Sequence, residues 1–245
     1  MDLLPADLEA HIRDAVRHYW RTRQGQATKQ VEAGTVQDYG ARSQVTGGKH
    51  MDGFVELIRE VVHHVGLPEE SVHTGSRLEL PGFYRASKQW DLLVLHDGQL
   101  LAAIELKSQV GPSFGNNFNN RTEEAMGTAA DTRAAIDHGA FGASSPWLGW
   151  LMLLEDAPKS RAPVKVFSPH FDPLPEFGQA SYAKRYVLFC QKLRVQLLYD
   201  GTALLMSPAT ATDSGDWIDE EPEISITAFL KSLAVHLSAT QGKAR

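Results

Sequence analysis

Cysteine is almost absent from this sequence, which has Cys190 alone among 245 residues. A single cysteine cannot form an intramolecular disulfide, and the apolar residues 186–189 before it predict a buried structural thiol and not a nucleophile. Long hydrophobic runs are absent as well, so no segment is expected to cross a membrane. The first seven residues lack the basic start and apolar core of a secretory signal, and these absences together favour a cytoplasmic protein.

A surplus of positive charge is also missing, because 24 Lys and Arg face 30 Asp and Glu, for a net charge of −6. This balance argues against a protein that holds nucleic acid through bulk charge alone. The charges are unevenly distributed, however: residues 11–50 carry seven Lys and Arg against three Asp and Glu, while acidic residues gather between 213 and 223. A local basic face can bind DNA on an acidic protein. Phosphate contact and simple solvation are both open for Arg13, Arg17 and Arg21, which share one helical face.

The most informative segment is a pair of apolar runs, residues 90–95 and 100–107, joined by the turn dipeptide Asp97-Gly98. This pattern predicts two antiparallel strands with a tight turn. Asp91 opens the first strand, and Glu105 and Lys107 lie near the end of the second. Side chains alternate between the two faces of a strand, so Glu105 and Lys107 project from one face, and Ile104 and Leu106 project from the other toward a core.

Two carboxylates and an amine at one sheet edge suit phosphodiester hydrolysis. Magnesium takes oxygen ligands and keeps several waters, so Asp91 and Glu105 can hold it and leave positions for a phosphate oxygen and a water. Lys107 can position or deprotonate that water, or neutralise the phosphate; a lowered pKa near a metal would suit deprotonation. The alternative is an ordinary strand with a solvated Glu105–Lys107 ion pair.

These three residues resemble the catalytic motif of the PD-(D/E)XK nuclease superfamily, with Asp91, Glu105 and Lys107 at its three positions and Trp90 in place of its proline. The runs at residues 45–54, 84–91 and 105–121 resemble the XhoI family of type II restriction endonucleases, and the likeness covers nearly the whole chain. The resemblance implies a homodimer that cuts both strands of double-stranded DNA at the palindrome CTCGAG with Mg²⁺, alongside a companion DNA methyltransferase.

Residues suited to DNA contact cluster in two predicted loops. The loop at residues 111–120 leads into the set Asn116, Asn117, Asn119, Asn120 and Arg121. Asn can pair with adenine edges and Arg with guanine edges; alternatively, Asn serves left-handed turn positions. The loop at residues 25–50 offers Arg42, Gln44 and Lys49. Glu56, on a predicted helix before the catalytic strands, is a possible accessory carboxylate or part of a solvated helix face.

The predicted fold class is α/β, a mixed β-sheet flanked by helices, in one domain over residues 1–245. Residues 1–50 would hold a helix and a DNA-contacting loop, residues 51–206 the catalytic core, and residues 207–245 a loop and a last helix. Apolar periodicity predicts helices at 6–24, 51–65, 123–137, 181–193 and 225–238, and strands at 77–80, 90–95, 100–107, 146–154, 195–199 and 203–206.

Three functions fit these observations. The first is the type II restriction endonuclease. The second is a DNA repair or junction-resolving nuclease of the same fold, which shares the chemistry but has another substrate. The third is a DNA-binding protein that has lost cleavage, which the retention of Asp91, Glu105 and Lys107 together disfavours.

Overall fold

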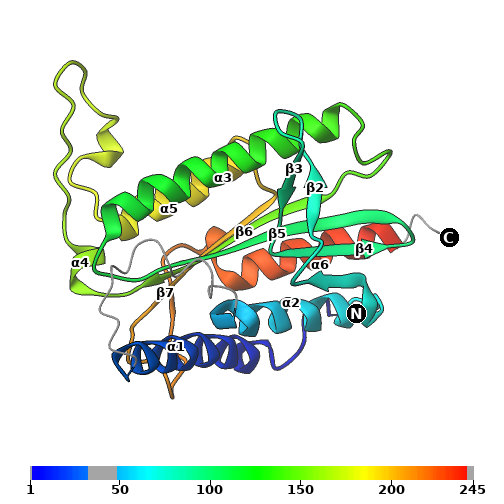
Figure 1. Cartoon of the computed structure of the whole chain (residues 1–245), viewed down its shortest axis with the longest axis horizontal. Helices are drawn as coiled ribbons and strands as arrows, with labels where there is room; N and C mark the ends of the chain where they lie inside the picture. Colours follow the sequence, from blue (N-terminus) through cyan, green and yellow to red (C-terminus); the bar gives the residue numbers. More distant parts are fainter. Residues whose placement is uncertain (1, 33–48, 242–245) are drawn as a thin grey trace.

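A mixed six-stranded sheet runs through the middle of the protein in this computed structural model, which describes residues 2–32 and 49–241 (Figure 1). The strand order is β1-β4-β5-β6-β7-β8. β5, β6 and β7 are parallel, and the other neighbours pair antiparallel. The strands are β1 (Val72–Thr74), β4 (Leu92–His96), β5 (Gln99–Gln109), β6 (Trp147–Glu155), β7 (Gly201–Ser207) and β8 (Ile218–Asp219). The predicted mixed α/β class is confirmed.

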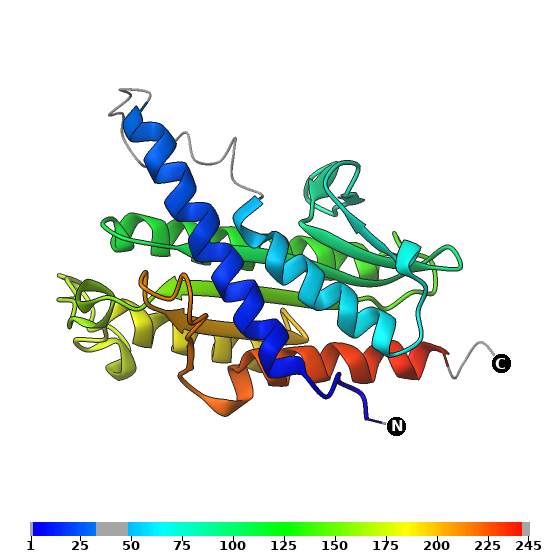
Figure 2. The same ribbon diagram turned by 90° about the horizontal axis from the view of Figure 1, so that it is seen from below.

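Helices cover both faces of this sheet (Figures 1 and 2). One face carries α1 (Leu8–Glu32), α2 (Asp52–His64) and α6 (Ile226–Gln241), and the other carries α3 (Phe114–Asp137) and α5 (Tyr182–Val195). The shorter helical segments are α4 (Pro158–Arg161), η1 (Lys49–Met51), η2 (Glu69–Ser71), η3 (Pro175–Phe177) and η4 (Pro222–Ile224). Each helix within the described ranges is too short or too polar to span a membrane.

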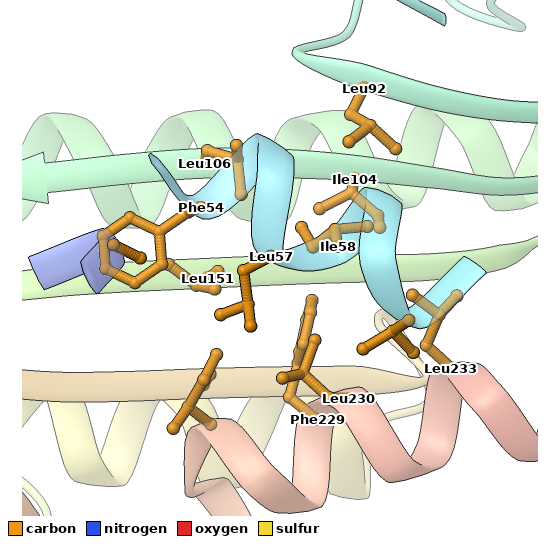
Figure 3. Packing of buried hydrophobic residues seen from close by; sticks show 14 of the residues in the cluster. Phe54, Leu57, Ile58, Leu92, Ile104, Leu106, Leu151, Phe229, Leu230 and Leu233 are labelled. Carbon is orange, nitrogen blue, oxygen red and sulfur yellow. The ribbon is translucent and has the colours of Figure 1, made fainter. Parts of the chain in front are cut away.

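The two faces of the sheet bury separate cores. Ile104 and Leu106 of β5 pack with α2 and α6, as Figure 3 shows from close by. Ala103 of β5 faces the opposite core, with the aromatic residues of α5. The apolar run of β6 is buried on both faces, as predicted for a central strand.

The predicted turn between β4 and β5 is confirmed. Asp97 has φ 49° and Gly98 has φ 72°, so both central residues are left-handed. This geometry matches the right-handed twist of two strands joined by a two-residue loop, and it explains the Asp-Gly pair. The turn pairs His96 with Gln99, and a register shift between Val94 and Leu95 then places Leu92 opposite Ile104.

Three expected elements are wrong. α1 continues through residues 25–32, which we expected to be a loop. The expected loop 111–120 is helical from Phe114, ahead of the predicted start beyond Thr122. The expected strand 195–199 is the end of α5 followed by a reversal, with Leu197 at φ 54°. Apolar residues misled the last prediction, because Val195 and Leu197 are each 76% exposed.

A separate two-stranded hairpin, β2 (Glu79–Pro81) and β3 (Ser87–Gln89), rises beside α3 (Figure 1). The sequence predicted only the first of these strands. Leu78, Leu80 and Trp90 place the base of the hairpin on the core shared with α3 and α5.

The arginine stripe of α1 faces acidic residues of the chain. Arg13 pairs with Asp216 at 2.9 Å, and Arg21 pairs with Asp213 at 3.0 Å. The basic and the acidic concentrations seen in the sequence therefore meet and compensate. Because these pairs are largely exposed, each contributes little stability, and nothing in this arrangement favours phosphate contact over the solvated ion-pair alternative.

Candidate active site

The β4–β5 hairpin brings Asp91, Glu105 and Lys107 together. Asp91 lies just before β4, and its Oδ2 accepts hydrogen bonds from the Leu106 backbone N–H at 2.8 Å and from Lys107 Nζ at 3.0 Å. Lys107 Nζ lies 3.9 Å from Glu105 Oε1. The two carboxylates therefore converge on one ammonium group.

Glu105 is the buried member of this cluster, with 1% of the residue exposed. Its Oε1 accepts a hydrogen bond from Lys88 Nζ, while its Oε2 is buried and makes no well-aligned hydrogen bond. The buried Tyr199 hydroxyl, which donates to the Ala125 carbonyl at 3.3 Å, also lies beside this carboxylate, and burial first and the charge of Glu105 next raise the pKa of Tyr199. A buried carboxylate oxygen without a well-aligned hydrogen bond is rare in folded proteins and calls for an explanation. A hard cation bound by this oxygen would provide one, so the residues present fit a magnesium site. No group of three or more His, Cys, Asp or Glu gathers in the described residues, so water and substrate would complete the coordination.

Lys107 carries a raised pKa in the absence of a bound cation. Burial lowers this pKa, but the negative charges of Glu105 and Asp91 and the hydrogen bond to Asp91 outweigh burial. If Lys107 deprotonates the attacking water, its pKa must be lowered. A bound cation would lower this pKa, because it would compete with Lys107 for the same two carboxylates.

An open cleft of about 710 Å³ lies over this cluster, between β5, α3 and the β2–β3 hairpin. Its cations are Arg85, Lys88, Lys107 and Arg121, and its wall on α3 includes Glu124, Thr128 and Asp131. Arg121 also pairs with Glu124 at 2.9 Å. Lys88 further lies 5.6 Å from the ring centre of Trp90. Four carboxylates, Glu105, Glu123, Glu124 and Asp131, line the cleft beside these four cations. Such a mixed lining suits an anionic substrate that arrives with a metal ion.

The four asparagines lie in the first turns of α3. Asn116, Asn119 and Asn120 are exposed, while Asn117 donates from Nδ2 to the Ser113 carbonyl at 2.8 Å. The left-handed alternative for them is wrong, because the non-glycine residues with positive φ in the described chain are Arg77, Asp97, Gln179 and Leu197. Positions 116, 119 and 120 share a helix face at i, i+3 and i+4.

The remaining predicted site residues are dispersed. Lys49 is exposed at the start of η1, and Arg42 and Gln44 lie outside the described residues. Glu56 is not brought to the site: α2 packs on the opposite face of the sheet, and Glu56 pairs with Arg59 at 3.3 Å. Cys190 is fully buried as predicted, and burial raises the pKa of its thiol.

Sequence reasoning missed Tyr84 and Asp131, which line the cleft. Asp131 sat in a predicted helix as an ordinary polar residue, and only the fold brings it to the hairpin 46 residues earlier in the chain. A spacing pattern within one element carries no signal for such a pair.

Comparison with known proteins identifies the family. The family profile described as "Restriction endonuclease XhoI" matches residues 29–219. The type II restriction enzyme BstVI of Geobacillus stearothermophilus is 48% identical over 207 residues, which cover 82% of this chain and 92% of that enzyme. The type II restriction enzyme XhoI of Xanthomonas vasicola is 49% identical over 173 residues, 69% of this chain and 70% of that enzyme.

The type II restriction enzyme AbrI of Azospirillum brasilense is likewise 49% identical over 173 residues, 70% of this chain and 77% of that enzyme. No solved structure matches the chain. These relatives favour the restriction enzyme over a repair or junction-resolving nuclease and over a DNA-binding protein without cleavage. The chain belongs to the XhoI family of type II restriction endonucleases, and it is a site-specific deoxyribonuclease.

Proposed function

We propose that this enzyme hydrolyses both strands of double-stranded DNA with Mg²⁺, at a PD-(D/E)XK site formed by Asp91, Glu105 and Lys107. The observation that carries the proposal is the buried Glu105 Oε2 without a well-aligned hydrogen bond, next to a second carboxylate and a lysine. By family resemblance, the recognised site is CTCGAG. A companion DNA methyltransferase would protect the host sites.

Asp91 and Glu105 would hold the metal ion through their carboxylate oxygens. A bound Mg²⁺ would polarise the scissile phosphate and lower the pKa of a coordinated water. The Leu106 N–H and Lys107 Nζ hold the Asp91 carboxylate in place. Lys107, held by Asp91, can donate a hydrogen bond to the attacking water or to a phosphate oxygen at the same point. Lys88 offers a second ammonium at the same Glu105 oxygen that Lys107 approaches.

The exposed face of α3 is the element best placed for base readout. A helix fits the major groove of B-DNA, and Asn side chains there can bond adenine N6 and N7. Asn116, Asn119 and Asn120 are exposed on α3, whose next turns line the cleft through Arg121 and Glu124. A base-reading Asn is worth roughly 1–3 kcal/mol of discrimination at one base pair.

Two asparagines of the same helix provide a matched test of base readout by α3. Asn120→Ala should relax cleavage specificity at one base pair, whereas Asn117→Ala should not, because Asn117 is bonded to the backbone of its own helix. Cleavage of a set of singly altered sites measures both variants. Unchanged site preference in Asn116→Ala, Asn119→Ala and Asn120→Ala alike would move readout away from this helix face.

The enzyme is also proposed to act as a twofold homodimer, since one site cuts one strand of a palindrome. The apolar face of α6 formed by Phe229, Leu230, Leu233 and Leu237 is buried in the core and so cannot form the contact. The segment after α4 projects from the body (Figure 1) and exposes Phe167 and Phe171 by 89% and 84%. Such exposed apolar groups favour contact with a second copy of the chain.

Sedimentation of the wild type and of the double variant Phe167→Ser/Phe171→Ser tests the dimer. The wild type should sediment as a dimer, and the variant should already dissociate into monomers at higher protein concentrations than the wild type. A wild type that is monomeric both free and on DNA would refute the dimer, and a variant that dimerises normally would refute this surface.

The first experiment is digestion of plasmid DNA by the purified enzyme, with Mg²⁺ or with a chelator, followed by sequencing of the fragment ends. Cleavage at CTCGAG with Mg²⁺ alone is expected. Defined cleavage at another palindrome would refute the proposed site and keep the chemistry. Undiminished cleavage in the chelator would refute the metal mechanism.

A further inference from the structure

The tip of the β2–β3 hairpin, residues 82–86, overhangs the cleft and is unusually exposed for its composition. Tyr84 is 76% exposed and Phe83 is 45% exposed, although both are aromatic. Tyr84 and Arg85 line the same cleft as Glu105 and Lys107. A two-stranded hairpin is only marginally stable by itself, so contacts from elsewhere must fix the position of these side chains.

Asp131 of α3 supplies those contacts. Its side chain is 4% exposed. Its Oδ1 accepts the backbone N–H groups of Phe83 at 2.8 Å and Tyr84 at 2.7 Å, and its Oδ2 accepts Arg85 Nε at 2.7 Å. Burial raises the pKa of Asp131, but the hydrogen bonds from Tyr84, Arg85 and Phe83 outweigh burial and hold that pKa below its usual range. One buried carboxylate therefore fixes three successive residues of the tip.

Gly82 gives independent evidence that the tip is closed tightly on this carboxylate. A Cβ atom at position 82 would lie 2.5 Å from Asp131 Oδ2 and 2.7 Å from the Arg85 carbonyl oxygen. Only glycine lets the backbone approach so closely. On the far side of the tip, the Phe83 ring lies against His138 at the end of α3, with 4.2 Å between ring centres.

Simple anchoring of the hairpin does not account for what the tip displays. The base of the hairpin is already held by Leu78 and Leu80 in the core. The clamp instead fixes the exposed ring of Tyr84 and the Arg85 side chain, which is 44% exposed while its Nε and Nη2 bond Asp131 and Thr128. No described residue accepts a hydrogen bond from the Tyr84 hydroxyl. Aromatic rings, Tyr hydroxyls and Arg side chains in such positions contact the sugar-phosphate backbone or stack on unpaired bases.

We propose that Tyr84 and Arg85 bind the DNA strand that is cut, next to the scissile phosphate, and that Asp131 is the positioning residue that preassembles this contact. The inference rests on the proposed cleavage site at Asp91, Glu105 and Lys107. The partner is the backbone of DNA, so the contact should serve every sequence alike and should contribute to binding more than to site preference.

Steady-state cleavage of a short duplex separates these roles. Tyr84→Ala should raise KM roughly tenfold, with kcat within about threefold, because one contact to the DNA backbone is lost. Arg85→Ala should also weaken binding and flatten its dependence on salt. Val195→Ala is the matched control, since Val195 is equally exposed at 76% and lies outside the cleft; its kinetics should equal those of the wild type.

A double-mutant cycle tests the positioning role of Asp131. If Asp131 acts by positioning Tyr84, the rise in KM of Tyr84→Ala/Asp131→Ala should be smaller than the product of the two single rises, whereas independent effects would multiply. Asp131→Asn keeps an oxygen for the two backbone N–H groups but loses the acceptor for Arg85 Nε, so it should recover the part of the affinity that depends on Tyr84. Gly82→Ala should reproduce the Asp131→Ala defect from the opposite side of the contact.

The possible results distinguish the DNA contact of Tyr84, the positioning role of Asp131 and the proposed function. A Tyr84→Ala variant with unchanged KM would overturn the contact, and a cycle with multiplicative losses would overturn the positioning role. Because Tyr84 is exposed, its variant does not threaten folding, and thermal melting checks the Asp131 and Gly82 variants. A wild type that fails to cut DNA, or that cuts without dependence on Glu105, would instead be a failure of the proposed function.

Discussion

Replacement of Asp91 by Asn and by Ala separates the structural from the catalytic part of this side chain. The Asp91 carboxylate accepts the Leu106 N–H at 2.8 Å and Lys107 Nζ at 3.0 Å. Asn keeps an oxygen for the backbone N–H and removes the negative charge, whereas Ala removes both. We expect both variants to lose cleavage and only the Ala variant to lose stability.

The magnitudes follow from exposure and chemistry. An orphaned buried N–H costs about 1–3 kcal/mol, and because the Asp91 side chain is 42% exposed, water can replace part of this bond. We therefore expect a loss of about 1 kcal/mol for Asp91→Ala, or roughly 2–4 °C in Tm for a chain of this size. Each variant should lose at least about 10²-fold in cleavage rate, the scale for one preorganised group that stabilises transition-state charge.

The assays are single-turnover cleavage with Mg²⁺, thermal melting, and DNA binding without metal. Binding should persist or tighten in both variants, since a carboxylate near phosphate repels it. Asp213→Asn, at an exposed acidic residue of the α1 contact, is the control and should cut normally. An Asp91→Asn variant that cuts at a rate near that of the wild type would refute the reasoning.

Three further outcomes follow from the structure. Lys107→Ala should lose most cleavage activity while its metal affinity changes less. Normal cleavage by this variant would favour the alternative that Glu105 and Lys107 are an ordinary ion pair on a strand. His50 is buried, and burial first, then nearby positive charge, lowers its pKa from 6.5 to about 4. Since the unfolded chain binds the proton more readily, stability should be complete above pH 6.5 and should fall by up to about 3 kcal/mol as the pH drops toward 4. A His50→Gln variant should flatten this part of a melting-against-pH profile, and an unchanged profile would contradict the assignment. Gly201→Ala would place a Cβ 2.3 Å from the Trp147 ring and should lower the free energy of unfolding by about 1–3 kcal/mol in denaturant titration. Gly127→Ala, with nothing within 4 Å of the added Cβ, should instead stabilise α3 by up to about 1 kcal/mol. Equal effects in the two glycine variants would contradict this packing.

The cluster around Glu105 could be predicted from the sequence because its residues lie on two strands that are adjacent in the chain. A two-residue turn joins β4 and β5, and strand alternation beyond the register shift at Val94 and Leu95 puts Glu105 and Lys107 on one face. The unbroken apolar run of β6 similarly predicts a strand buried on both sides. Such features depend on neighbours in the chain, which a spacing pattern contains.

Features that depend on residues far apart in the chain could not be predicted from the sequence. Asn and Gly favour a loop at residues 115–120, but Phe114 and Phe118 lie one helical turn apart and pack on Tyr182 and Tyr186 of α5, which outweighs local propensity. The Asp131 contact with the hairpin tip likewise joins residues 46 positions apart. Glu56 was placed near the site by the order of elements, yet the fold assigns α2 to the other face of the sheet.

The most direct test of the central claim is the cleavage rate of Glu105→Gln on a duplex with one site, in Mg²⁺ and at saturating enzyme. Gln keeps the size of this buried side chain and removes the charge that would bind the metal. Glu56→Gln is the matched control, because Glu56 is an exposed glutamate on the opposite face of the sheet. The account predicts that Glu105→Gln binds the duplex and does not cut it, while Glu56→Gln cuts at the wild-type rate. Cleavage by Glu105→Gln at the wild-type rate would contradict it.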